Sequence, residues 1–137
     1  MTDQEFPIVN KRTALQINDV HTEILLTGFS DKIFIVVTQY GKIGSLIQTT
    51  LDISPHLVTN PSTVPTTSQV LFGESTGTQS DLYSLYASSI SQAICAMNPN
   101  EKRPVVLGIA LKPVDTMDKQ RQVFHSVIDK IMENPIW

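Results

Sequence analysis

Two stretches of this sequence are apolar on both faces of the strands that they are expected to form. Successive side chains of a strand point to opposite faces of the sheet, and a strand with one face in water alternates apolar and polar residues. Residues 33–37 read Ile-Phe-Ile-Val-Val and residues 105–111 read Val-Val-Leu-Gly-Ile-Ala-Leu, without one polar side chain. Both faces of these two strands must therefore be covered by other parts of the protein.

The first half of the chain is rich in further strand signals, chiefly β-branched and aromatic residues between turn-forming residues. Asn18-Asp19 marks one turn, and Gly41 and Gly44 mark a tight connection. We expect the strand after Gly44 to return as the antiparallel neighbour of the strand before Gly41. The expected strands are residues 15–17, 20–29, 33–40, 45–51, 69–72 and 105–111.

Residues 52–68 are rich in Pro, Thr, Ser and Asn, and they include Pro55, Pro61 and Pro65. This composition disfavours both helix formation and sheet pairing. We therefore expect a long loop in this segment, and a loop of such length in a compact domain is typically functional or mobile.

Two helices are expected in the second half, because apolar residues recur there at three- and four-residue spacing. The first spans residues 80–97, with Thr78 and Asp81 spaced as in a capping box. The second spans residues 116–133, and Asp115 can cap its start. The side chains expected on the inner faces are Leu82, Leu85, Tyr86, Ser89, Ile90, Ala93 and Met97 in the first helix and Met117, Phe124, Val127, Ile128 and Ile131 in the second.

This order of elements predicts an α+β fold, with a single domain over residues 1–137, a mostly antiparallel sheet of five to six strands, two helices and a strand-rich N-terminal half. Two helices of about five turns each can cover one face of such a sheet, but not both. A second protein subunit would cover the other face, since burying about 800 Å² per partner at roughly 25 cal/mol per Å² drives association. The alternative is that the sheet curls over itself or that the loop of residues 52–68 folds across it.

The formal net charge is −3, from 10 basic and 13 acidic residues spread along the chain. Without a cluster of Lys or Arg, we expect neither a nucleic-acid interface nor a basic membrane-binding face. Cys95 is the only cysteine, so neither an internal disulfide nor a multi-thiolate metal site can form. The N-terminal residues lack the features of a signal peptide. We expect a soluble protein of the cytoplasm, and also of the nucleus, with no metal and no cofactor.

The sharpest catalytic motif is Gly-Glu-Ser-Thr-Gly at residues 73–77, a G-x-S-x-G that in hydrolases places a serine on a strained turn between strand and helix. After Ser75, Asp115 or Asp118 and then His125 would complete the order serine, acid, histidine. The chain cannot hold the long parallel sheet of that fold, and it offers no oxyanion-hole motif. A plain turn is therefore the favoured interpretation, and no enzyme is expected.

His21-Thr22-Glu23 matches the H-x-E of zinc deaminases, but the cysteine ligands of that site are missing. On a strand, His21 and Glu23 share one face, so a solvated pair is the simpler interpretation. Cys95, on the expected inner helix face, is interpreted as a small buried apolar residue.

Residues 37–46, Val-Thr-Gln-Tyr-Gly-Lys-Ile-Gly-Ser-Leu, resemble the proteasome assembly chaperone 3 family. The order of elements agrees with that family, as do Val-Leu-Phe-Gly at residues 70–73 and the terminal Trp137. The resemblance implies a non-enzymatic chaperone of 20S proteasome assembly that binds α-subunits, the α5 type in particular, during α-ring formation. It also implies a dimer, formed with the fourth proteasome assembly chaperone or with a second copy of the chain.

Two sets of residues are the expected interfaces. The expected dimer face comprises Phe34, Val36, Val106 and Ala110. The expected partner-binding hairpin comprises Gln39, Tyr40, Lys42 and Ile43. For the dimer face, the alternate side chains on the other side of the same strands are an open alternative. For the hairpin, the alternative is a plain turn without a binding role. We expect Trp137 to pack on the core of its own chain rather than to serve as an exposed anchor.

Two other classes of function fit the sequence. One is a small dimeric adaptor, longin- or roadblock-like, in GTPase or trafficking complexes. The other is a serine hydrolase that uses Ser75. The proteins that co-purify with the chain would separate the chaperone from the adaptor, and labelling by a serine-reactive probe would reveal the hydrolase.

Overall fold

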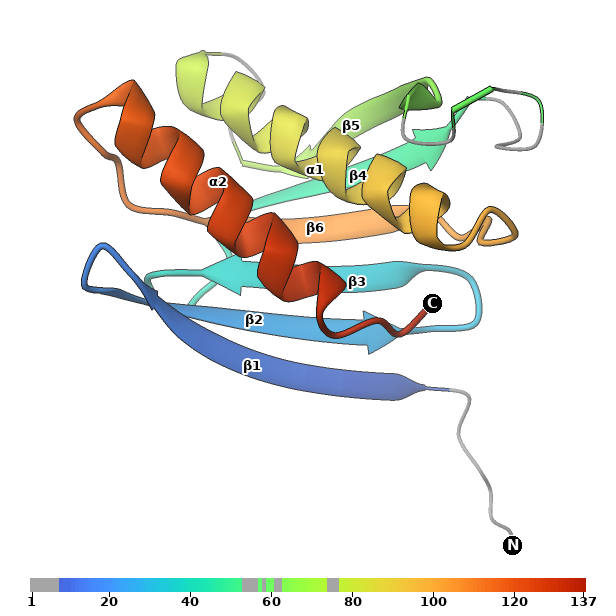
Figure 1. Cartoon of the computed structure of the whole chain (residues 1–137), viewed down its shortest axis with the longest axis horizontal. Helices are drawn as coiled ribbons and strands as arrows, with labels where there is room; N and C mark the ends of the chain where they lie inside the picture. Colours follow the sequence, from blue (N-terminus) through green and yellow to red (C-terminus); the bar gives the residue numbers. More distant parts are fainter. Residues whose placement is uncertain (1–7, 53–56, 58, 61–62, 74–76) are drawn as a thin grey trace, which may run out of the picture.

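The computed structural model describes residues 8–52, 57, 59–60, 63–73 and 77–137. In these residues the strands form one sheet of six, in the order β1-β2-β3-β6-β4-β5 (Figure 1). Four of the five strand pairings are antiparallel, and β3 and β6 are parallel. The predicted α+β fold with a mostly antiparallel sheet is therefore confirmed. The elements are β1 (Val9–Ile17), β2 (Val20–Gly28), β3 (Ile33–Thr38), β4 (Ser45–Leu51), β5 (Thr66–Phe72), α1 (Thr78–Met97), β6 (Val105–Ala110) and α2 (Met117–Met132).

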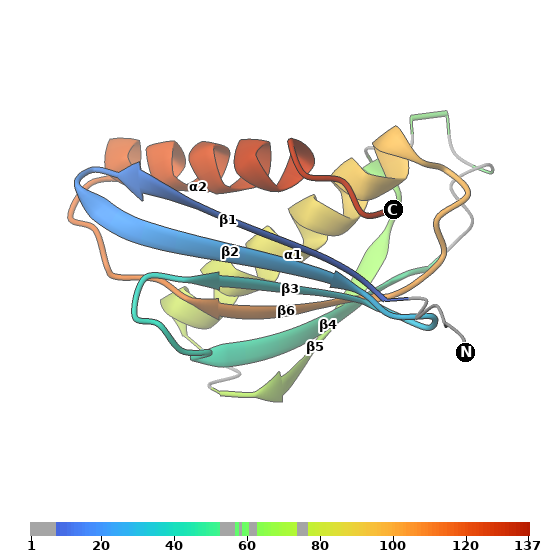
Figure 2. The ribbon, with the colours of Figure 1, turned by 90° about the horizontal axis from the view of Figure 1, so that it is seen from below.

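Both helices lie on the same face of the sheet, and the described residues place nothing comparable on the other (Figure 2). α1 packs against β4, β5 and β6, and α2 packs beside α1 and reaches β1. The core lies between the helices and the sheet, with Ile35 of β3 and Leu107 of β6 at its centre as register partners. Trp137 packs on the edge of this core, as predicted.

The central position of β6 corrects the predicted meander. β4 does not lie beside β3, because β6 is inserted between them and pairs with both strands. β3 and β6 are the two strands that are apolar on both faces, and the middle of the sheet is where both faces can be most deeply covered. β4, which carries Gln48, Thr49 and Thr50, is accordingly displaced outward.

The β1–β2 turn forms where the sequence predicts it. Asn18 and Asp19 both have positive φ, at 51° and 65°, which is the signature of a two-residue type I′ hairpin turn. Asn and Asp tolerate this left-handed region better than other non-glycine residues do.

The long loop ends earlier than predicted, because β5 begins at Thr66 instead of residue 69. The Thr49 and Ser68 hydroxyls lie 3.0 Å apart, and the Asp52 amide donates to the Pro65 carbonyl at 2.9 Å. Small polar residues are compatible with an edge strand when the neighbouring strand offers matching partners. Pro55 and Pro61 lie outside the described residues.

The inner face of α1 differs from the predicted stripe. Tyr86 and Ile90 are buried as expected, but Leu85 is 54% exposed and Met97 is also exposed. The buried line instead also includes Tyr83, Ala87 and Ile94. The predicted capping box is also wrong, because Gly77 is the N-cap and no side chain caps the helix.

α2 follows the predicted stripe over most of its length. Val127 and Ile131 are buried and Phe124 and Ile128 pack against the core, whereas Met117 is exposed, contrary to prediction. The N-cap is also not the predicted Asp115. The side chain of Thr116 accepts a hydrogen bond from the Lys119 amide at 3.2 Å, while Asp115 forms an ion pair with Lys119 at 3.3 Å.

Candidate partner-binding face

The face of the sheet opposite the helices, the open face, carries a cross-strand row of residues, of which Gly108 at the centre is buried. Strand register aligns Leu25 of β2 with Val36 of β3, Val36 with Gly108 of β6, and Gly108 with Leu46 of β4. The row ends at Phe72 of β5, which pairs with Leu46 at a shift in the β4–β5 register and is 64% exposed. A row without one polar side chain across five neighbouring strands is unusual for a solvent-facing sheet surface.

The four residues predicted for the dimer face all lie on the open face, but only Phe34 and Val36 are partly exposed, whereas Val106 and Ala110 are buried at 6% and 5% exposure. Phe34 pairs with Val106, and Ala110 pairs with Thr38, two residues along β3 from Val36. The side chains of opposite parity, including Ile33 and Ile35, are fully buried on the helix side. The structure thus shows which alternate side chains of β3 and β6 face away from the helices. The docking of a partner on that face stays a prediction.

Leu25, Leu46 and Phe72 belong to the same surface and were missed by the sequence analysis. On its face of β2, Leu25 lies between the polar residues Glu23 and Thr27. This pattern indicates a single apolar side chain on a polar strand face, and it could have identified Leu25. Leu46 and Phe72 join the row only because β6 is inserted between β3 and β4. No local pattern in the sequence predicts that β6 lies between β3 and β4.

A hollow of about 590 Å³ lies in the open face. Leu25, Phe34 and Val36 supply its apolar lining, and Arg12 and Glu23 supply charged groups at the side of β1 and β2. An apolar lining beside a few charged groups is the usual composition of a site that receives an apolar side chain of a protein partner.

The segment of residues 39–44 forms one wall of this hollow. It is not the predicted hairpin, because it passes from β3 to β4 across the end of β6; we term it the crossover loop. Ile43 lies over Gly108, where an added Cβ would be only 3.1 Å from two Ile43 carbons. A Cβ on Gly44 would likewise lie 3.1 Å from the Cβ of Ala110, so this glycine permits the loop to approach β6 closely.

The four residues predicted for the hairpin divide into two kinds. Gln39 is engaged within the chain, because its amide nitrogen donates to the Thr22 hydroxyl at 3.1 Å and its amide oxygen accepts from the Lys112 backbone at 2.7 Å. Tyr40, Lys42 and Ile43 are exposed. The Lys112 ammonium lies 5.7 Å from the centre of the Tyr40 ring. Only these three exposed residues are available to a partner.

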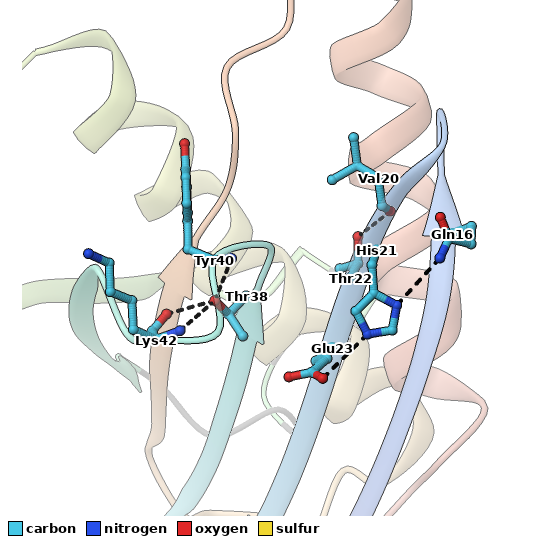
Figure 3. A network of polar contacts seen from close by, with 8 residues as sticks. All are labelled: Gln16, Val20, His21, Thr22, Glu23, Thr38, Tyr40 and Lys42. Carbon is cyan, nitrogen blue, oxygen red and sulfur yellow. Dashed lines mark hydrogen bonds and ion pairs between the residues drawn. The ribbon is translucent and has the colours of Figure 1, made fainter.

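The remaining candidates for chemistry in the sequence are His21, Glu23, His125 and Ser75. His21 and Glu23 lie 3.3 Å apart as an exposed pair, with Gln16 3.4 Å from the histidine ring (Figure 3). His125 is exposed on α2, and Ser75 lies outside the described residues. Among the residues that the structure describes, no group of three His, Cys, Asp or Glu could hold a metal ion. No helix in the same residues has the length and apolar character needed to cross a bilayer.

The described groups with shifted pKa values lie away from the open face. Burial raises the pKa of Tyr86, in the core under the helices, and raises that of Cys95, which is 2% exposed and thus buried as predicted. Hydrogen bonds from Arg103 lower the pKa of Glu101 in the α1–β6 connection.

A two-layer α+β domain with helices on one face and an apolar row on the other has the surface expected of a protein-binding domain. The family model described as proteasome assembly chaperone 3 matches residues 35–134. Proteasome assembly chaperone 3 of Mus musculus is 28% identical over 95% of both chains, and that of Nematostella vectensis is 31% identical over 80% of this chain and 79% of its own. The chain belongs to the proteasome assembly chaperone 3 family, and its role is that of a non-enzymatic assembly chaperone.

The fold is also similar to a solved structure. A chain from the "Crystal Structure of a Novel Chaperone Complex for Yeast 20S Proteasome Assembly" superposes with a TM-score of 0.57. The match covers 88% of this chain and 97% of the yeast chain at 11% identity. At that identity the likeness shows a shared fold.

Proposed function

We propose that this chain promotes 20S proteasome assembly by binding α-subunits while the α-ring forms, as one half of a dimer joined through the open face. The observation that carries the dimer is the row from Leu25 to Phe72, which the two helices leave uncovered. An apolar surface of this kind is stabilised when a partner removes it from water.

The partner on the open face is the fourth proteasome assembly chaperone or a second copy of this chain. The yeast protein with the same fold was crystallised as a chaperone complex, which supports a partner chaperone. A standard interface removes about 800 Å² from each partner, and the sheet offers an apolar centre with a charged margin at Arg12 and Glu23.

The exposed part of the crossover loop, Tyr40, Lys42 and Ile43, is the surface proposed to contact the α-subunit, of the α5 type by the family resemblance. Aromatic residues are over-represented among the residues that dominate binding energy, so Tyr40 is the strongest candidate anchor. We further propose that the chain acts in the cytoplasm, and also in the nucleus. Imaging of a tagged chain would test this localisation.

The test is affinity purification of the tagged chain from cells, followed by identification of the bound proteins. Wild type should recover proteasome α-subunits and a partner chaperone, but no peptidase-active proteasome. Val36→Asp should lose the partner chaperone, because it places a charge in the middle of the apolar row. Leu85→Asp is the matched control, since Leu85 is exposed on the helix side and its change should leave binding intact.

Recovery of mature proteasomes, or of no α-subunit, would contradict the chaperone function. Equal binding by Val36→Asp and Leu85→Asp would contradict the assignment of the dimer to the open face. Thermal unfolding of both purified variants controls for the fold, since neither residue is fully buried.

A further inference from the structure

Thr38, the last residue of β3, holds the backbone of the crossover loop through one hydroxyl group. Its Oγ1 donates to the Lys42 carbonyl at 2.7 Å and accepts from the amides of Tyr40 and Lys42, at 3.1 Å each (Figure 3). Thr38 is 6% exposed, so these three contacts are largely shielded from water. A buried hydroxyl that pairs with three backbone groups of one short loop fixes the shape of that loop.

Further contacts hold the same loop at both ends. Gln39 joins its start to Thr22 of β2 and to Lys112 after β6. Ile43 rests on Gly108, where an added Cβ would lie 3.1 Å from two Ile43 carbons and would require the Ile43 side chain to shift. Gly41, with φ of +76°, supplies the left-handed conformation that the turn requires. The loop is therefore preformed in the free chain.

The crossover loop lies between two hollows in the surface, so its conformation affects both. On one side lies the 590 Å³ hollow of the open face, and on the other lies a second hollow of about 410 Å³ between the loop, β6 and the start of α1. Lys42 lines both hollows, and Tyr40 lines the second. A loop that is the shared wall of two hollows determines the shape of each.

We propose that Thr38 is a positioning residue for α-subunit binding, whose hydroxyl holds the crossover loop in the conformation in which Tyr40, Lys42 and Ile43 contact the α-subunit. This inference rests on the proposed function, because it concerns the same protein-binding surface. A preformed loop avoids the entropy cost of ordering on binding. If only a fraction of the molecules has the binding-competent loop conformation, the apparent affinity is reduced by that fraction.

The test compares Thr38→Val, which removes the hydroxyl at nearly constant volume, with Thr38→Ser, which keeps it. Thr49→Val is the matched control, since Thr49 is buried on the helix side and its hydroxyl meets Ser68 instead of the loop. The first readout is amide hydrogen exchange at Tyr40 and Lys42. Exchange should be at least about tenfold faster in Thr38→Val and unchanged in Thr38→Ser and Thr49→Val, because a free energy of 1.4 kcal/mol corresponds to a factor of ten.

The second readout is the dissociation constant for a recombinant proteasome α-subunit of the α5 type, the proposed partner of the crossover loop. Thr38→Val should weaken this binding by about tenfold, with Thr38→Ser and Thr49→Val within about twofold of wild type. Wild-type binding that Thr38→Val leaves unchanged would overturn this inference and leave the proposed function intact. Failure of wild type to bind the α-subunit would overturn both.

Discussion

Arg103 connects two parts of the fold that are distant in sequence. Its Nη1 donates to the Phe29 carbonyl at 2.8 Å, and its Nε and Nη2 donate to the two carboxylate oxygens of Glu101 at 2.8 Å each. The bidentate pair thus links the connection before β6 to the turn between β2 and β3. The Glu101 side chain is only 9% exposed, so this pair is shielded more than the other ion pairs described.

The Arg103–Glu101 pair predicts how stability depends on pH. Hydrogen bonding by Arg103 lowers the pKa of Glu101 in the folded state. The pair therefore stabilises the fold above the ordinary glutamate pKa, about 4.3, and this stabilisation is lost as the pH falls through the lower folded pKa. Glu101→Gln should lose about 1–2 kcal/mol at pH 7 and show a smaller further loss at pH 3 than wild type. Urea unfolding at the two pH values measures both, and parallel losses in the two proteins would contradict the assignment.

At the scale of elements, the sequence predicted each described strand as a strand and each helix as a helix. The errors concern where some elements begin or end and which side of a helix is buried. The strand of residues 45–51 was placed correctly, but its neighbour was wrong. Hydrophobic periodicity reports whether a residue is buried, but not which strand lies beside it. The face of α1 was wrong at Leu85 and Met97 because two apolar lines at helical spacing compete there, and only packing on the sheet selects one.

The sequence also does not determine which residue is the N-cap of α2. Asp115 and Thr116 are both suitable N-cap residues, and the structure selects Thr116. Thr116→Ala should therefore lower the free energy of unfolding by about 1 kcal/mol. Asp115→Ala is the control, since its exposed ion pair with Lys119 should contribute less than about 0.5 kcal/mol. Chemical denaturation of both variants measures the difference, and a larger effect at Asp115 would reverse the assignment.

At the scale of the molecule, the sequence predicted that a sheet face would lack cover, and it named four of the residues on that face. Residues 33–37 and 105–111 sufficed for this, because a strand that is apolar on both sides needs two covering layers. The extent of the surface could not be predicted. Leu46 and Phe72 join it through the order of strands in the sheet, and Ile43 joins it through the path of the crossover loop over Gly108.

The central claim is that a protein partner covers the open face, and methyl accessibility tests it most directly. Paramagnetic relaxation by a soluble gadolinium chelate would be recorded for the methyl groups of Val36, Leu46 and Leu85, with the chain alone and with the fourth proteasome assembly chaperone added. The account predicts that Val36 and Leu46 are protected in at least one of the two samples while Leu85 stays accessible. Val36 and Leu46 methyl groups that remain open to the chelate in both samples would contradict it.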